Sequence, residues 1–270
     1  MGRAPKNARR EAIVVTGTSD ASTGDIEIVF FDAGNTLLGP HPSFHELFSQ
    51  VCSEHGHDVP PDVVLRVQNE LAPDLIDLAE DTGVDNPSFS KEESERFWGY
   101  LYARFLEDLE IDDDGLAAAL LQRFSTGSSY LLFDDVLPTL HGMQAQGYRL
   151  GLISNFEQWL EERLIELEVG HLFDVSVISG FVRIEKPDPA IYELALERAR
   201  VEPTKAIHVG DSMSMDVEPA GSVGMHTVLL DRDGRYPDSA TLRIASLEEL
   251  PGVVAKLGVD QNSENHENRA

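Results

Sequence analysis

The chain has 270 residues, of which 41% are hydrophobic and 26% are charged, a composition typical of a folded globular protein. Its formal net charge is −27, from 48 acidic and 21 basic residues. We therefore expect no nucleic-acid partner and no anionic membrane surface as a partner, because binding to either depends on lysine and arginine.

Three features favour a soluble, cytoplasmic protein. The single cysteine, Cys52, excludes an internal disulfide. No apolar run approaches the roughly 18 residues that span a bilayer. After the basic residues near the N-terminus, the apolar stretch covers only 12–15, whereas a secretory signal needs roughly 7–15 apolar residues. We expect a cytoplasmic location and leave the oligomeric state open.

The surplus of acidic residues suggests adaptation to high salt as a hypothesis. Only five residues are lysines, and acid-rich, lysine-poor surfaces stay solvated where concentrated salt screens their charge repulsion. An acidic protein with no such history is the alternative. If the hypothesis holds, the melting temperature rises with KCl concentration, and a melting temperature that does not rise contradicts it.

Alternating strand and helix patterns predict an α/β fold. Short apolar runs predict buried strands at 26–31, 149–153, 174–178, 206–209 and 226–230. Helical patterns lie between or before the later strands, at 135–146, 156–168, 188–200 and 214–222. Strands that alternate with helices favour a parallel sheet. The polar ends of the chain, 1–24 and 259–270, are expected to be a disordered arm and tail.

The segment 41–134 has a different pattern and offers no convincing strand. Capping boxes begin two predicted helices, at Ser43–Glu46 and Ser90–Glu93, and further helices are expected near 61–72 and 114–125. The first two predicted strands are therefore separated by far more chain than a crossover requires. We expect a helical domain, 41–134, inserted into an α/β core made of 25–40 and 135–258.

Polar residues follow the ends of several predicted strands or precede the helices between them. They are Asp32, Ser154, Asn155, Lys186, Asp211 and Asp216. The carboxyl ends of parallel strands meet at one edge of the sheet, where α/β proteins bind ligands. Two acids spaced like Asp211 and Asp216 suit a hard cation. The same residues are also ordinary helix caps and turn residues, so only their combination indicates a site.

The order of these motifs resembles the haloacid dehalogenase (HAD) superfamily. Its pattern is DxDGT, then a strand-end Ser or Thr, then Lys-Pro, then GDxxxD. The resemblance covers about 26–258, and SNF at 154–156 and EKPDP at 185–189 are most similar to the subgroup around haloacid dehalogenase-like hydrolase domain-containing protein 3. It implies a Rossmann-like parallel-sheet core with an inserted α-helical (C1-type) cap.

The resemblance also implies a reaction and the residues that carry it out. Asp32 would be the nucleophile and would form an aspartyl-phosphate with a small phosphorylated metabolite. Ser154 and Lys186 would bind the transferring phosphoryl group, and Asn155 would also contribute to substrate binding. Thr36 would fix the turn after the nucleophile and is included in the predicted substrate site.

A magnesium ion is the cofactor that the resemblance implies. Its predicted ligands are the carboxylates of Asp32 and Asp211 and the backbone carbonyl of Gly34, with water completing the coordination. Asp216 would orient this network or a water on the metal. Lys186 would balance the clustered acids, which could not all remain ionised without a positive charge nearby.

One residue departs from the family pattern in a way that bears on activity. The family's phosphatases carry a second aspartate two residues after the nucleophile, which protonates the leaving group and then deprotonates the attacking water. Gly34 occupies that position here. General acid–base help is worth roughly 10²–10⁴ in rate, so its loss is large. Asn35 replaces the usual glycine, although Asn tolerates a positive φ better than most residues.

Several functions remain open at this point. In the first hypothesis, the protein is a Mg²⁺-dependent phosphatase. It would then be limited to leaving groups that need little protonation, or another residue would donate the proton, with His41 or His45 as hypothetical donors in place of the missing aspartate. Alternatively, it is a catalytically impaired protein that binds phosphorylated ligands. A metal-free 2-haloacid dehalogenase is less favoured because of Asp211. A phosphonate hydrolase would need a cap lysine, and Lys91 is typical of a solvated helical turn.

The predicted cap carries two further signals. Residues 40–135 hold 21 acidic and 5 basic residues, which disfavours polyanionic substrates and favours a small monophosphate. His41, His45 and Cys52 lie close in sequence and could form a zinc site, but ordinary cap residues are the favoured interpretation.

Overall fold

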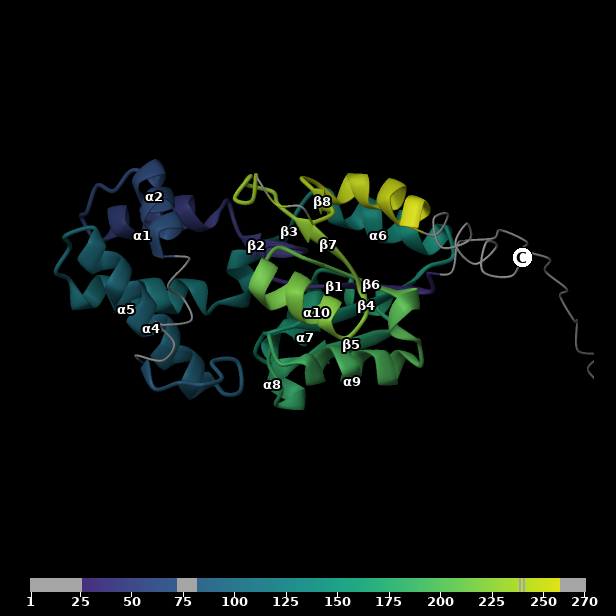
Figure 1. Ribbon diagram of the computed structural model, residues 1–270. Helices are drawn as coiled ribbons and strands as arrows, with labels where there is room; N and C mark the ends of the chain where they lie inside the picture. The colour runs from purple at the N-terminus through teal and green to yellow at the C-terminus, as the bar shows by residue number, and fades with distance from the viewer. Residues whose placement is uncertain (1–25, 72–81, 238, 240, 258–270) are drawn as a thin grey trace, which may run out of the picture.

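The computed structural model describes residues 26–71, 82–237, 239 and 241–257. The predicted arm and tail lie outside the described residues. The chain forms an α/β core and a separate group of helices on one side of it (Figure 1). Among the described residues, no helix combines the length and the apolar character needed to cross a membrane.

A six-stranded parallel sheet forms the centre of the core, in the order β5-β4-β1-β6-β7-β8. Its strands are β1 Ile28–Phe31, β4 Arg149–Ser154, β5 Val175–Ile178, β6 Ala206–Gly210, β7 His226–Leu230 and β8 Arg243–Ile244. The central strands are buried on both faces, which is why they are continuous apolar runs in the sequence. The five predicted strands are confirmed, and β8 was too short to predict.

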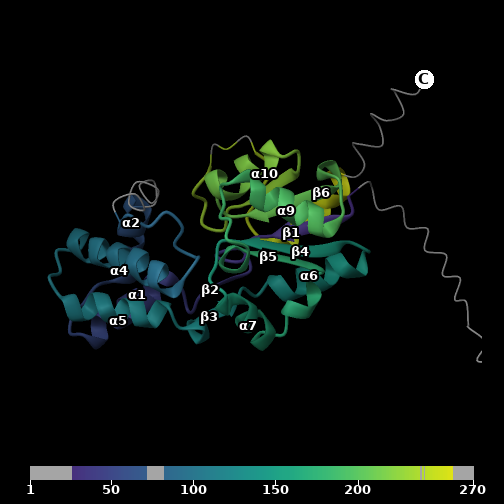
Figure 2. The same ribbon diagram turned by 90° about the horizontal axis from the view of Figure 1, so that it is seen from below.

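Helices cover both faces of the sheet (Figure 2). One face carries α6 Val136–Ala145 and α7 Trp159–Glu166, and the other carries α9 Pro189–Ala199 and α10 Glu218–Ser222. Each face has its own hydrophobic cluster, and the helical residues 250–257 join the cluster of α6 and α7. The fold is therefore a three-layer α/β sandwich, as predicted.

The helix predicted over 214–222 is divided. Its first part is a π-helical turn, η5 Met213–Val217, in which the amide of Val217 donates to the carbonyl of Ser212. α10 follows, with Pro219 in its first turn, where the missing amide hydrogen costs nothing. Wider turns of this kind are frequent at functional sites.

The segment between the first two core strands folds into four described helices. They are α1 Phe44–Glu54, α2 Pro61–Leu71, α4 Lys91–Asp108 and α5 Asp114–Phe124. Ser43 and Ser90 accept hydrogen bonds from the amides of Glu46 and Glu93, as the sequence predicts. These helices enclose a hydrophobic cluster separate from those of the sheet. We refer to this group as the cap.

The absence of a strand from 41–134 was a wrong prediction. β2 Leu38–Pro40 and β3 Tyr130–Leu132 pair as an antiparallel ribbon where the chain enters and leaves the cap. Three residues are too few for a recognisable alternation, and the pairing arises only when the two connections run side by side. Gly39 is required there, because a Cβ atom would lie 2.9 Å from the ring of Phe133.

Candidate active site

The predicted site residues gather at one edge of the sheet. Asp32 directly follows β1, Ser154 ends β4, and Asp211 directly follows β6. Because these strands are parallel neighbours, their carboxyl ends lie together. Lys186 reaches the same place from the loop between α8 Ser179–Val182 and α9. The chain enters the cap shortly after Asp32, so the cap lies beyond the carboxyl ends of the strands (Figure 1).

Lys186 joins two buried carboxylates. Its Nζ lies 2.7 Å from Oδ1 of Asp32 and 2.6 Å from Oδ1 of Asp216, and its side chain is only 4% exposed. Ser154 Oγ donates to the same Oδ1 of Asp32 at 3.0 Å. The other carboxylate oxygen of Asp32 accepts no hydrogen bond from the described residues. That oxygen is left for a substrate or a cation.

Asp216 is the most heavily hydrogen-bonded acid in the site. Besides Lys186, Nε2 of the buried His208 lies 3.0 Å from its Oδ1, and the amide of Ser212 donates to its Oδ2 at 3.1 Å. Burial by itself would raise the pKa of Asp216, but Lys186 and His208 outweigh it and lower that pKa. The ionised carboxylate only accepts, so Nε2 of His208 carries the hydrogen. Asp216 therefore stays ionised beside the ammonium group.

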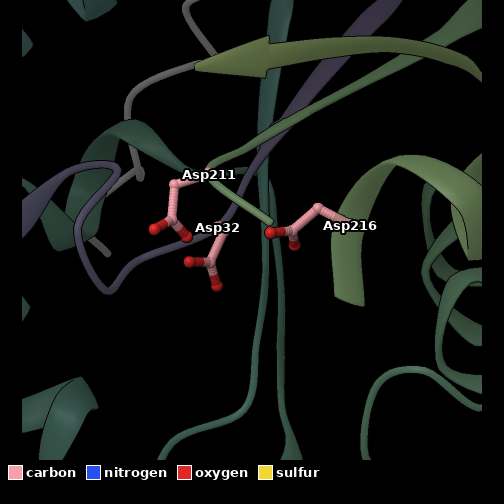
Figure 3. A group of neighbouring side chains, drawn as sticks. All are labelled: Asp32, Asp211 and Asp216. Carbon is pink, nitrogen blue, oxygen red and sulfur yellow. The ribbon is translucent and has the colours of Figure 1, made fainter. Parts of the chain in front are cut away.

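The three aspartates form an oxygen-rich cluster that fits a hard cation. Figure 3 shows Asp32, Asp211 and Asp216 with their carboxylates facing one another, and one oxygen from each lies within 4.8 Å of the others. Carboxylate oxygens are the ligands that Mg²⁺ and Ca²⁺ prefer. Burial raises the pKa of Asp32 in spite of Lys186, as expected for a cluster short of positive charge. Gly34 lies in the turn after Asp32, and its carbonyl remains a predicted ligand.

An arginine that the sequence reasoning missed pairs with Asp211. The Arg235 guanidinium donates to Oδ2 of Asp211 at 2.7 Å. Asp231 holds this loop, since its carboxylate accepts from the amides of Arg235 at 2.7 Å and Tyr236 at 3.1 Å. Burial and the neighbouring carboxylates raise the pKa of Asp211 to about 6, although Arg235 opposes them. The sequence signal that could have identified Arg235 is its place just beyond the carboxyl end of the predicted strand 226–230.

The structure shows the surroundings of two predicted substrate-binding residues, Asn155 and Thr36. Asn155 donates to the carbonyl of Lys186 at 2.8 Å and accepts from its amide at 2.7 Å, so its side chain holds the backbone of Lys186. Thr36 is fully buried, and its hydroxyl has no partner among the described residues. The turn is held instead by Arg232, which donates to the carbonyls of Asn35 at 3.3 Å and Thr36 at 2.9 Å.

The cap meets the core close to Lys186. The amide of Ser88 in the cap donates to Glu185 at 2.8 Å, and the hydroxyl of Ser94 in α4 donates to Glu157. Burial raises the pKa of both glutamates. The cap thus touches the residues that flank the site in sequence.

The hypothetical zinc site does not form. Of the groups of three or more potential ligands in 26–71, 82–237 and 241–257, none contains His41, His45 or Cys52. Cys52 is buried in the hydrophobic cluster of the cap, and His41 is exposed. Among the described residues, no hydrogen bond joins His41 or His45 to Gly34, so the structure gives neither histidine support as a substitute proton donor.

Comparison with protein families identifies the fold that carries this site. The family model of haloacid dehalogenase-like hydrolases matches residues 26–224 of the chain. The chain belongs to this family. The matched range includes Asp32, Ser154, Lys186, Asp211 and Asp216.

Curated relatives include two phosphatases. Glyceraldehyde 3-phosphate phosphatase of Methanopyrus kandleri is 38% identical over 127 residues, covering 46% of this chain and 53% of that protein. Its counterpart from Pyrococcus furiosus is 28% identical over 243 residues, covering 86% and 94%. Haloacid dehalogenase-like hydrolase domain-containing protein 3 of Mus musculus is 38% identical over 115 residues, covering 43% and 46%. The chain thus spans about half the length of the first and third.

Solved structures of the family include two different chemistries. A HAD phosphatase from Thermococcus onnurineus has a TM-score of 0.53 at 26% identity and covers 85% of this chain and 98% of its own. A 2-haloacid dehalogenase from Pseudomonas syringae has the same TM-score at 25% identity and covers 86% and 99%. Because the two are equally similar in shape, overall shape does not distinguish the reactions, and the side chains of the site must be considered.

Proposed function

We propose that this protein is a Mg²⁺-dependent phosphatase of small organic monophosphates that acts through an aspartyl-phosphate on Asp32. The observation that carries the proposal is the third carboxylate, Asp211, whose oxygen lies within 4.8 Å of oxygens of both Asp32 and Asp216. A metal-free reaction at carbon has no use for this additional, partly buried acid. A cation held by these carboxylates would use it, because the positive charge would let the acids stay ionised next to an anionic phosphate.

The chain's own residues divide the reaction between them. A carboxylate oxygen of Asp32 attacks phosphorus, and the bond from phosphorus to the leaving oxygen breaks with its electron pair on that oxygen. Lys186 and Ser154 hold Asp32 and can donate to the phosphoryl oxygens. The departed oxygen takes up a proton from the solvent. Water then attacks phosphorus and gives up a proton to the solvent, the bond to Asp32 breaks with its electron pair on the carboxylate, and inorganic phosphate leaves. Bound Mg²⁺ would offset the negative charge that gathers on the phosphoryl oxygens.

Gly34 restricts which leaving groups this site can handle. It offers no side chain to protonate the departing oxygen, so groups that leave without a proton are favoured. The cap's 21 acidic residues against 5 basic residues in 40–135 disfavour polyphosphates. Two relatives are named as glyceraldehyde 3-phosphate phosphatases, which makes this monophosphate the first candidate substrate.

The proposal is tested by measuring phosphate release from purified protein, with and without Mg²⁺, at low and at multimolar KCl. Acetyl phosphate and glyceraldehyde 3-phosphate serve as substrates, and Asp32→Asn serves as the control. We expect release that requires Mg²⁺ and disappears in the variant, with acetyl phosphate the faster substrate. No release under any of these conditions would overturn the proposal.

Mg²⁺ binding should weaken on acidification because Asp211 must be ionised to act as a ligand. With the pKa of Asp211 raised to about 6, the carboxyl group takes up a proton below that pH and competes with the metal. Titration calorimetry between pH 7.5 and 5 should show the affinity falling through a midpoint near 6. Arg235→Gln removes the charge that opposes the shift, so its midpoint should move to higher pH. A midpoint unchanged or lowered in Arg235→Gln would contradict this.

Two alternatives are supported by specific observations. Gly34 is also what a protein that binds phosphorylated ligands without turnover would carry, and calorimetric phosphate binding without release would support that function. The guanidinium of Arg235, 2.7 Å from Asp211, is a cationic group at the site that needs no metal, as a dehalogenase requires. Chloride release from 2-chloropropionate in the absence of Mg²⁺ would support this second alternative.

A further inference from the structure

Arg232 connects three segments that are far apart in the sequence. It follows β7 and donates to both carboxylate oxygens of Asp135, at 2.8 and 2.9 Å. It also donates to the carbonyls of Thr36 at 2.9 Å and of Asn35 at 3.3 Å. Its guanidinium carbon lies 4.2 Å from the centroid of the Phe133 ring. The planar, forked guanidinium is the side chain suited to serve a carboxylate and two carbonyls at once.

The Asp135 end of this network is anchored in the core. Asp135 is 8% exposed and also accepts from the hydroxyl of Ser246 and the amide of Leu247, both at 2.9 Å. Burial by itself would raise the pKa of Asp135, but the hydrogen bonds from Arg232 and Leu247 outweigh it and lower that pKa. Asp135 is therefore an anion at neutral pH, and it holds Arg232 against the body of the α/β core rather than against the cap.

The other end of the network is the turn that follows the nucleophile. Within this turn, the amides of Leu37 and Leu38 donate to the carbonyl of Ala33, and Asn35 has a left-handed backbone with φ 53°. The Thr36 hydroxyl makes no hydrogen bond within the described residues. The side-chain support of the turn's carbonyls thus comes from Arg232.

The same arginine lies at the connection that returns from the cap. Phe133 directly follows β3, its amide donates to the carbonyl of Leu37 at 3.1 Å, and its ring covers the guanidinium. Gly39 leaves space for that ring. Arg232 is therefore enclosed between the turn after Asp32 and the connection between cap and core, with a side chain only 19% exposed.

We propose that Arg232 is a positioning residue that sets the geometry of the turn 33–37, and through it the placement of Asp32 and of the Gly34 carbonyl. The consequence for the reaction rests on the proposed phosphatase function, whereas the consequence for the turn does not. Loss of Arg232 lowers kcat and weakens Mg²⁺ binding. It leaves KM nearly unchanged, because Ser154 and Lys186 still bind the phosphate.

The test compares Arg232→Met with Arg149→Met. Arg149 makes the same kinds of contact, because it donates to the carboxylate of Asp174 and to the carbonyl of Ala199, both at 2.9 Å. It lies at the amino end of β4, however, whereas the site lies at the carboxyl ends of the strands. Hydrogen exchange read by mass spectrometry reports on the Leu37 and Leu38 amides. In Arg232→Met we expect the amides of the 33–38 peptide to exchange at least tenfold faster than in the wild type. We expect kcat on acetyl phosphate to be at least tenfold lower, with KM within about threefold of the wild-type value. Millimolar guanidinium should restore part of kcat.

Arg149→Met should show none of these changes. Unaltered exchange of the 33–38 peptide in Arg232→Met overturns the inference, whether or not the wild-type protein releases phosphate. Faster exchange without phosphatase activity in the wild type leaves the positioning role standing and removes the proposed function alone. If Arg232→Met does not fold, Arg232→Lys replaces it. One ammonium group cannot serve both Asp135 and the two carbonyls, so wild-type exchange in that variant also overturns the inference.

Discussion

Replacement of Lys186 by methionine is expected to reduce phosphate release about 10²–10³-fold and the free energy of unfolding by about 3–5 kcal/mol. The kinetic loss arises because Lys186 is, among the described residues, the only lysine in the site, and its Nζ lies 2.7 Å from Oδ1 of the proposed nucleophile, Asp32. The loss of stability arises because Asp32 and Asp216, with side chains 8% and 2% exposed, lose the ammonium group that compensates their buried charges.

Urea unfolding and steady-state kinetics of Lys186→Met measure both effects, and Lys205→Met is the matched control. Nζ of Lys205 lies 2.6 Å from Glu27, as close an ion pair as those of Lys186, but both side chains are more than 40% exposed. An exposed pair contributes about 1 kcal/mol at most. Equal losses of stability in the two variants would contradict the importance of burial. A fall in turnover of less than about tenfold in Lys186→Met would remove Lys186 from the catalytic group.

Replacement of Gly34 by aspartate is expected to raise turnover of glyceraldehyde 3-phosphate by about 10²-fold or more, while acetyl phosphate turnover changes little. The position has room, because a Cβ atom on Gly34 meets only Phe156 Cε2, at 3.9 Å. Its backbone is not among those with positive φ, so the substitution brings no conformational strain. The new carboxyl group would restore a proton donor for a leaving alkoxide, which acetyl phosphate does not need.

Gly34→Asn controls for size and polarity, because it adds a side chain of the same shape that cannot transfer a proton at neutral pH. The ratio of the two turnover rates on each substrate is the decisive measurement. If Gly34→Asn gains as much as Gly34→Asp, or if neither changes the sugar phosphate rate, proton donation is not what limits this enzyme. If neither variant changes the rate on glyceraldehyde 3-phosphate, binding of phosphorylated ligands without turnover becomes the favoured function.

The residues at the strand ends could be predicted because two simple rules determine them. Apolar runs mark buried strands, and parallel strands bring their carboxyl ends to one edge, so Asp32, Ser154 and Asp211 had to be neighbours. The cap helices could be predicted because their caps and apolar faces are local. The contacts of Arg232 and Arg235 could not, since both residues lie in a loop whose path depends on hydrogen bonds to Asp135 and Asp231.

The hydrogen bonds of Asn155 show the same limit at the level of a single side chain. A strand-end amide can face a substrate or a neighbouring backbone, and the loop of Lys186 provides two hydrogen bonds that settle the choice. The ribbon of β2 and β3 also depends on a partner more than eighty residues away in the chain, so no local pattern announces it.

By itself, the sequence determined the α/β class, the inserted helices and the acids at the strand ends, because these follow from local periodicity and residue identity. The missing acid at Gly34 followed from the resemblance to the HAD family pattern. Only the tertiary structure decided which charges meet. The lowered pKa of Asp216, the raised pKa of Asp211 and the hold of Arg232 on the turn after Asp32 arise from burial and from contacts between distant segments. Electrostatic interactions depend on distance and on exclusion of water, and both are properties of the folded chain.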